Sequence, residues 1–277
     1  IGFFDEKIFI YLEEIDLLGI TCVGGNATLE NTKLNTLKIC SLLNRKDILI
    51  YSGASKPLVY DLVTAEHVHG KSGLDNDGEE IKVDEDHFIQ ELNAVDYIIK
   101  TCKTSEEKIY LCPTGPLTNI ALSLKKDPSI KENIKEIVFM GGAALSLGNI
   151  TPAAEFNIYV DPHAANIVLK SGIPITMMGL DVTHKVNVNK RIIQSIKSNN
   201  NKASMFFADL MEFYSKFNNE LYDTDESPLH DPCVIAYLID NKLFYGKKVH
   251  VEVEENSELT RGDTVTDWWG VKNLKPN

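Results

Sequence analysis

The chain has 277 residues, 43% of them apolar, which is enough to bury a substantial core, and no internal repeat or low-complexity tract divides it. With 28 basic against 40 acidic residues the formal net charge is −12, and no stripe of Lys and Arg is present that could displace counterions from a nucleic acid. The composition therefore favours one domain over residues 1–277 and disfavours nucleic-acid binding.

Short β-type runs alternate with helical patterns along the chain. The runs are apolar, rich in Ile, Val and Tyr, and cover residues 17–23, 47–51, 108–112, 136–140, 174–178 and 248–253. A helix is predicted between the second and third runs because apolar residues recur on one helical face, at Phe88, Leu92, Val95 and Ile99. Asp161-Pro162 and Gly172 carry the start and stop signals of another helix, and two more are predicted over residues 202–215 and 233–240. This alternation predicts an α/β fold, with a mainly parallel central sheet flanked by helices.

Cysteine usage and hydropathy bear on the compartment. The five cysteines show no C-x-x-C spacing and lie mostly in apolar runs, which indicates buried thiols in a reducing environment. No apolar run approaches the roughly 18 residues that a membrane-spanning helix needs. We therefore expect a cytoplasmic protein that does not associate with membranes.

The residues that directly follow the predicted strands are unusually polar or small. They are residues 24–26, 113–116, 141–142 and 179–181. In open α/β sheets, ligands bind at the carboxyl ends of the strands, so these loops are expected to meet at one edge of the sheet. His230-Asp231 is expected to be a fifth contributor.

The segment from Gly141 to Pro162 holds three polar side chains among small and apolar neighbours: Asn149, Glu155 and Asn157. Polar groups in such surroundings need hydrogen-bond partners, since each unmet one costs about 1–3 kcal/mol. One interpretation is that they tie the loop to itself. The other is that they bind a polyhydroxyl ligand, because amides and a carboxylate suit sugar hydroxyls, which both donate and accept.

The segment C-P-T-G-P-L-T-N, residues 112–119, places two prolines around Thr114 as the chain leaves a predicted strand. The prolines restrict the backbone and stop further strand pairing, so a rigid turn is one interpretation. The other is that the carbonyl of Thr114 is held towards a hard cation such as calcium or magnesium, which take oxygen ligands.

Two histidines, His67 and His69, are two residues apart, and a strand would place them on the same face. No further soft or imidazole ligand has a spacing that would complete a zinc site. A surface histidine or a loop histidine near a ligand remains as the interpretation.

His230 and Asp231 lie between two prolines, directly before an apolar run. Asp231 followed by Pro232 at the first helical position predicts a helix cap. That interpretation accounts for the aspartate but leaves His230 unexplained.

Taken in order, the motifs V-G-G-N-A, H-G-K-S-G-L-D, P-T-G-P-L-T-N, V-F-M-G-G-A, G-N-I-T-P-A-A-E-F-N-I-Y-V-D-P and P-L-H-D-P resemble those of the inosine–uridine-preferring nucleoside hydrolases. The resemblance extends from about Leu17 to Trp268. Each motif alone is weak, but six in series are very specific, and the one from Gly148 to Pro162 is the longest.

The resemblance implies hydrolysis of the N-glycosidic bond of ribonucleosides, with a calcium ion bound at the strand ends. It implies that Asp231 and the Thr114 carbonyl are metal ligands, and that the ribose is surrounded by Asn26, Met140, Asn149, Glu155 and Asn157. It gives His230 the role of protonating the leaving base and His69 a place in the same pocket. Tyr214 is matched to a tyrosine of the element that covers the base.

The chain departs from the family at its beginning, where the family carries an aspartate-rich D-x-D-x-G-x-D-D segment. Aligning Gly2 with the motif glycine makes Asp5 a metal ligand and puts Phe4 where the water-activating base should be. Two interpretations follow: an active enzyme whose ends are incomplete in this chain, or a diverged homologue that binds nucleoside or ribose without turnover. The family also implies a homodimer or homotetramer.

Overall fold

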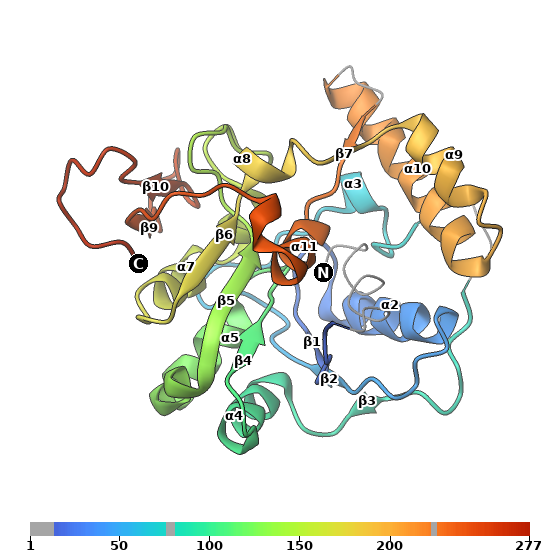
Figure 1. The fold of residues 1–277 in the computed structure, drawn as a ribbon, viewed down its shortest axis with the longest axis horizontal. Helices are drawn as coiled ribbons and strands as arrows, with labels where there is room; N and C mark the ends of the chain where they lie inside the picture. The colour runs from blue at the N-terminus through green and yellow to red at the C-terminus, as the bar shows by residue number, and fades with distance from the viewer. Residues whose placement is uncertain (1–13, 76–80, 223–225) are drawn as a thin grey trace.

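Parallel strands form the centre of the molecule in two groups of three (Figure 1). The computed structural model describes residues 14–75, 81–222 and 226–277. One group has the order β1 (Ile20–Cys22), β2 (Ile50–Ser52) and β3 (Ile89–Gln90), and the other has the order β4 (Ile109–Leu111), β5 (Ile134–Met140) and β6 (Ile175–Met178). Every pairing within the two groups is parallel. The predicted mainly parallel α/β architecture is confirmed.

Helices connect the strands and cover both faces. They are α2 (Leu29–Leu42), α3 (Glu66–His69), α4 (Ala94–Thr104), α5 (Thr118–Lys126), α6 (Phe156–Val160), α7 (Pro162–Leu169), α8 (Leu180–Thr183), α9 (Lys190–Lys197), α10 (Lys202–Tyr222) and α11 (Pro232–Ile239), with short 3₁₀ helices η1 (Pro128–Asn133) and η2 (Asn241–Leu243). Two antiparallel pairs complete the described part: β7 (Asn187–Val188) with β8 (Ser227–Pro228), and β9 (Val251–Val253) with β10 (Thr264–Thr266).

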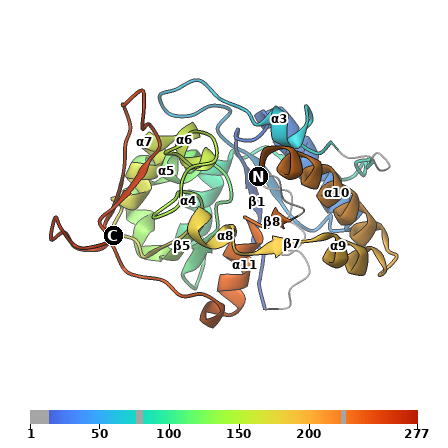
Figure 2. The same ribbon diagram turned by 90° about the horizontal axis from the view of Figure 1, so that it is seen from above.

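The central strand β5 shows how the two layers of helices are specified. Its side chains alternate between faces, so Ile137 and Phe139 pack against α4, α5 and α7, whereas Val138 and Met140 pack against α11. Seen from above, α11 lies on the opposite side of β5 from α5 and α7 (Figure 2). A strand segment buried on both faces reads as a continuous hydrophobic run, as residues 137–140 of β5 do.

The two groups of strands are joined at their carboxyl ends by one side chain. Asn119 of α5 donates from Nδ2 to the carbonyl of Cys22 at 2.9 Å and accepts from the N–H of Ala54 at 2.8 Å. Residues of β1 and β4 line a cavity of about 740 Å³, whose wall also includes Thr114. Asn119 lies on the helix that follows β4, so its amide fixes the loops after β1 and β2 against the second group of strands.

Three local predictions are wrong. The helix predicted to include Phe88 and Leu92 begins only at Ala94, because Asn93 caps it by accepting from the N–H of Asp96, and both earlier residues are exposed, by 64% and 37%. The residues between them form β3 instead. His67 and His69 do not share the face of a strand, since they lie in the single turn of α3.

The third correction concerns Asp231. It occupies the N-cap position of α11, but its backbone is already helical and its side chain makes no capping hydrogen bond. Its carboxylate is nevertheless buried, with 5% of the residue exposed. The helix begins with Pro232 at its first position, and the side chain of Asp231 does not cap it.

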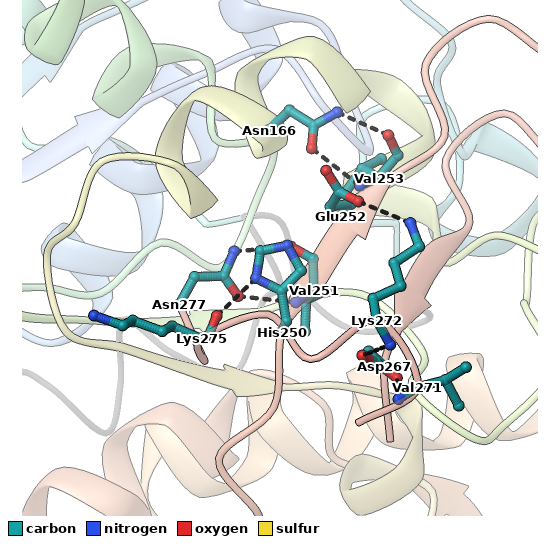
Figure 3. A network of polar contacts seen from close by, with 10 residues as sticks. All are labelled: Asn166, His250, Val251, Glu252, Val253, Asp267, Val271, Lys272, Lys275 and Asn277. Atoms are coloured by element: carbon teal, nitrogen blue, oxygen red, sulfur yellow. Dashed lines mark hydrogen bonds and ion pairs between the residues drawn. The ribbon is translucent and has the colours of Figure 1, made fainter. Parts of the chain in front are cut away.

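Towards the end of the chain, the outer edge of β9 is paired with side chains (Figure 3). Asn166 of α7 donates to the carbonyl of Val253 at 2.7 Å and accepts from its N–H at 3.0 Å. Asn277 does the same for Val251, at 2.8 Å in both directions. Each amide thus satisfies one residue's donor and acceptor in the manner of a neighbouring strand.

The structure describes the state of the cysteines and the hydropathy of the helices. All five cysteines are free thiols, and four of them are buried. Within the described ranges, none of the helices combines the length and the hydropathy that crossing a bilayer requires.

Candidate active site

Asn157, at the start of α6, joins three of the predicted site residues. Its Nδ2 donates to the carbonyl of Met140 at 3.1 Å and lies 3.3 Å from that of Thr114, with the Met140 sulfur at 3.4 Å. The amide therefore bridges the end of β5 and the turn after β4, as expected for loops at one sheet edge. Its Oδ1 makes no hydrogen bond to any described residue and can accept one from a ligand.

Glu155 organises the loop that precedes α6. One carboxylate oxygen accepts from the N–H of Asn157 at 3.0 Å, and the other accepts from Gly142 at 2.9 Å and Ile158 at 3.2 Å. Burial raises the pKa of Glu155 to about 7, against the opposing effect of these N–H groups. Most of the carboxylate's acceptor capacity is used within the chain. For Glu155, this agrees with the interpretation that the polar side chains of the loop bind the loop itself.

Asn149 supports the same helix start from outside. Its Oδ1 accepts from the N–H of Phe156 at 2.9 Å, while the residue itself is exposed. Its Nδ2 is not engaged by any described residue. Asn149 thus has a structural role and a donor left for a ligand.

A second cluster brings together Asn26, His69 and Tyr214 from three distant parts of the chain. Asn26 Nδ2 and His69 Nε2 are 3.2 Å apart, and the ring of His69 lies parallel to that of Tyr214 with 6.0 Å between centroids. Burial lowers the pKa of His69 to about 4, so this ring is neutral at pH 7. Flat, neutral rings of this kind suit contact with a planar apolar ligand such as a base.

The third cluster surrounds His230. Its Nδ1 is 2.8 Å from Oγ1 of Thr183, and the ring of His184 meets it edge-on with 5.6 Å between centroids. Burial, followed by the charges of His184 and His69, lowers the pKa of His230 to about 3. His230 Nε2 has no partner within the described residues.

Independent contacts place the three clusters next to one another. A Cβ on Gly25 would lie 2.8 Å from Cδ of Pro116, so the loop carrying Asn26 touches the loop carrying Thr114. Val68 of α3 packs against the apolar cluster that contains Phe156 of α6. Tyr214 of the second cluster and Leu229, which directly precedes His230, pack against the same apolar cluster. Nine of the predicted site residues lie in or directly flank these clusters: Asn26, His69, Thr114, Met140, Asn149, Glu155, Asn157, Tyr214 and His230.

Comparison with known proteins identifies the family. The family model of the inosine-uridine preferring nucleoside hydrolases matches residues 7–277. The chain belongs to the nucleoside hydrolase family. It is 44% identical over 279 residues to the pyrimidine-specific ribonucleoside hydrolase RihA of Escherichia coli O1:K1, an alignment that covers 99% of this chain and 88% of the relative. An uncharacterised protein of Schizosaccharomyces pombe is also 44% identical, over 95% of this chain and 84% of its own.

Solved structures agree with this assignment. The purine-preferring ribonucleoside hydrolase from Gardnerella vaginalis superposes with a TM-score of 0.89 at 33% identity, covering 98% of this chain and 88% of that one. A plant nucleoside hydrolase gives the same TM-score at 28% identity, covering 96% and 84%. The protein is a ribonucleoside hydrolase, and the family, fold and enzyme class predicted from the motifs are confirmed.

The metal ligands predicted for this nucleoside hydrolase are only partly described. The carbonyl of Thr114 and the buried carboxylate of Asp231 are hard oxygen donors of the kind that calcium takes. Asp5, the third predicted ligand, lies outside the described residues, as do Gly2 and Phe4. Within the described residues, no group of three or more His, Cys, Asp and Glu is arranged to hold a metal ion. The donor types fit calcium, but the described set needs further ligands.

Three residues that contact or position the candidate site were not singled out from the sequence. Thr183 and His184 contact His230 directly, and Asn119 fixes the loops after β1 and β2. Asn119 was visible only as the last letter of the P-T-G-P-L-T-N motif. Thr183 and His184 followed the polar residues 179–181 in the sequence, a signal that pointed to the loop but not to these side chains.

Proposed function

We propose that this enzyme hydrolyses ribonucleosides with His230 donating a hydrogen bond to the leaving base and with a divalent cation, calcium, assisting at the sugar. The observation that carries the proposal is the environment of His230. Its ring is held at Nδ1 by Thr183, its Nε2 is open, and the His69–Tyr214 pair lies close by. A hydrogen-bond donor beside a stacking surface is what departure of a heterocyclic base requires.

In the reaction, the oxygen of water bonds to C1′ of the ribose and the C1′–N bond breaks. Its electron pair leaves with the base, which takes one proton, and the products are free ribose and free base. Positive charge develops on the sugar and negative charge on the base in the transition state, as in glycoside hydrolysis generally. Because the ring of His230 is neutral at pH 7, it stabilises the departing base by a hydrogen bond that strengthens as negative charge develops.

The ribose is assigned to the part of the site formed by Asn157 and Asn149, and the base to the part formed by His230, His69 and Tyr214. The unengaged Oδ1 of Asn157 and Nδ2 of Asn149 supply an acceptor and a donor for ribose hydroxyls. Glu155 holds the loop that positions both, and Met140, whose sulfur lies 3.4 Å from Nδ2 of Asn157, is assigned to the apolar wall beside the sugar. Asn26 fixes His69 at the boundary between sugar and base.

Asp231 and the carbonyl of Thr114, together with Asp5, are the residues that would hold the cation. A calcium ion held by these residues would supply an electrostatic anchor for the ribose diol and would lower the pKa of an attacking water. Support comes from the burial of Asp231, whose carboxylate does not cap its helix. The similar proteins are named as ribonucleoside hydrolases, which supports catalysis by this chain rather than binding alone.

The direct test is release of free base and ribose from uridine, cytidine and inosine, since the similar proteins include both a pyrimidine-specific and a purine-preferring enzyme. We expect turnover that is lost with a chelator and restored by calcium. Activity that persists through exhaustive chelation would remove the cation from the proposal. A thermal shift with ribose but no product would instead support the binding-only interpretation.

The role of His230 is tested by His230→Ala with two substrates. We expect a rate loss of about 10²–10³-fold on uridine or inosine, because removing one hydrogen-bond donor that stabilises charge developing in the transition state costs about that much. The loss should be much smaller on a p-nitrophenyl riboside, whose leaving group departs without help. Equal losses on both substrates would show that His230 does not act on the leaving group.

The cytoplasmic location and the homo-oligomeric state inferred from the family stay predictions. Cell fractionation and light scattering of the purified protein test them.

A further inference from the structure

Thr183 is the last residue of α8 and is fully buried. Its hydroxyl makes one hydrogen bond in the described part of the chain, to Nδ1 of His230 at 2.8 Å. A threonine hydroxyl always carries one proton to donate as well as lone pairs that accept. The direction of this single contact therefore decides which nitrogen of His230 bears the proton.

The short helix that carries Thr183 is fastened at its other end. The N–H of Leu180 donates to the carbonyl of Gly142 at 2.8 Å, and the carboxylate of Asp181 accepts from Ala144 at 2.6 Å and Leu145 at 2.7 Å. Gly179 lies so close to the same loop that an added Cβ would be 2.9 Å from the Gly142 carbonyl. Thr183 is thus held in place by the loop that also binds Glu155.

Two arrangements of the proton are possible. If Nδ1–H donated to Thr183, the buried proton of the hydroxyl would have no acceptor among the described residues, which is costly. If the hydroxyl donates to Nδ1, both the Thr183 hydroxyl and Nδ1 are satisfied, and the proton of the neutral ring sits on Nε2, where it is left for a ligand. The second arrangement is favoured on hydrogen-bond satisfaction alone.

We propose that Thr183 is a positioning residue that fixes His230 in the tautomer with its proton on Nε2 and so presents that N–H to the leaving base. The first half of this statement concerns the protein without substrate. The second half rests on the proposed function of His230. Without the Thr183 hydroxyl, the His230 ring can carry its proton on either nitrogen and can flip. Only part of the enzyme molecules would then present an Nε2–H donor to the base.

The tautomer is tested by ¹⁵N NMR of the histidine rings, without any substrate. In two-bond ¹H–¹⁵N spectra at neutral pH, we expect the His230 signals, assigned by their loss in His230→Ala, to show protonated Nε2 and bare Nδ1. In Thr183→Val, which keeps the shape of the side chain, the two nitrogens should move towards averaged values. A protonated Nδ1 in the wild-type protein would overturn the proposal, whether or not the enzyme turns over nucleosides.

The kinetic arm compares Thr183→Val, Thr183→Ser and Thr36→Val. Thr36 is the control, because it is another buried threonine, with its hydroxyl bonded to the carbonyl of Thr32 in α2. Thr183→Val should lower kcat on uridine or inosine by about 10- to 100-fold, as loss of one buried hydrogen bond to a reacting group does, and should lower it much less on p-nitrophenyl riboside. Thr183→Ser restores the hydroxyl and should restore most of kcat, and Thr36→Val should leave both substrates unaffected.

A loss in Thr183→Val that is equal on the two substrates would mean that the side chain only supports the structure, and the positioning role would be rejected. No loss on either substrate would reject it as well. Failure of the wild-type enzyme to release any base would count against the proposed function, and the NMR result alone would then decide the tautomer.

Discussion

At the scale of single residues, Glu155 has two opposing influences on its charge. Burial disfavours the carboxylate, while backbone N–H groups from Asn157, Gly142 and Ile158 favour it, and the net effect raises its pKa from 4.5 to about 7. The native state therefore holds this proton more tightly than the unfolded chain. The stabilisation is complete below pH 4.5 and is lost as the pH rises from 4.5 through 7.

The raised pKa of Glu155 leads to a prediction about how the stability depends on pH. From the raised pKa, Glu155 should remove roughly 3 kcal/mol from the free energy of unfolding between pH 4.5 and 7. Glu155→Gln cannot ionise, so its unfolding free energy should fall less over the same range. Urea denaturation at pH 5 and pH 7 measures this, with exposed Glu132→Gln as the control. An unchanged pH slope in Glu155→Gln would show that the carboxylate does not titrate in that range.

At the scale of elements, the β9–β10 hairpin contacts α6 through Arg261. The guanidinium lies between two tyrosine rings, 4.2 Å from the centroid of Tyr60 and 4.0 Å from that of Tyr159. Gly262 follows with φ +83°, and an added Cβ there would lie 2.6 Å from Cα of Tyr159. The hairpin therefore rests directly on the helix that begins with Glu155 and Asn157.

We expect Arg261→Met to lower the free energy of unfolding by about 1–2 kcal/mol, because a partly buried cation–π contact of this kind contributes that much. Arg45→Met makes the same change in an ion pair with exposed Asp47, where about 0–1 kcal/mol is expected. Chemical denaturation of both variants measures the difference. If the two variants lose the same amount, the stacking on Tyr60 and Tyr159 adds nothing beyond a surface contact.

The elements also show what a single sequence can predict. Strands and the loops after them were found because apolar runs bounded by glycine and proline are local signals. The predicted start of α4 was wrong because the apolar periodicity through Leu92 matched a helix. The capping interaction of Asn93 with Asp96 determines where the helix begins. The contact of Thr183 with His230 joins residues 47 positions apart, so neither side chain signals it in the sequence.

At the scale of the whole molecule, the predicted cation ligands come from distant parts of the chain. Thr114 follows β4 in the sheet, whereas Asp231 begins α11, which packs on the face of β5. An ion held by both would bind only the folded protein. Its binding energy would therefore add to the stability of the whole fold by mass action.

In protein stripped with a chelator, added calcium should raise Tm, by an amount equivalent to about 2.7 kcal/mol at 100 times the dissociation constant. Asp231→Asn should abolish most of this shift, and exposed Asp61→Asn should preserve it. Differential scanning fluorimetry with calcium, and with magnesium for comparison, measures both. A shift that survives in Asp231→Asn would place the cation elsewhere.

The amide pairing along the outer side of β9 has a consequence for how protein molecules associate with one another. An exposed strand edge is a template on which another chain can grow, and here Asn166 and Asn277 occupy its donors and acceptors. The native protein is thereby protected against fibril-like stacking at this margin. A molecule in which α7 has come loose would uncover the edge, and aggregation would begin there.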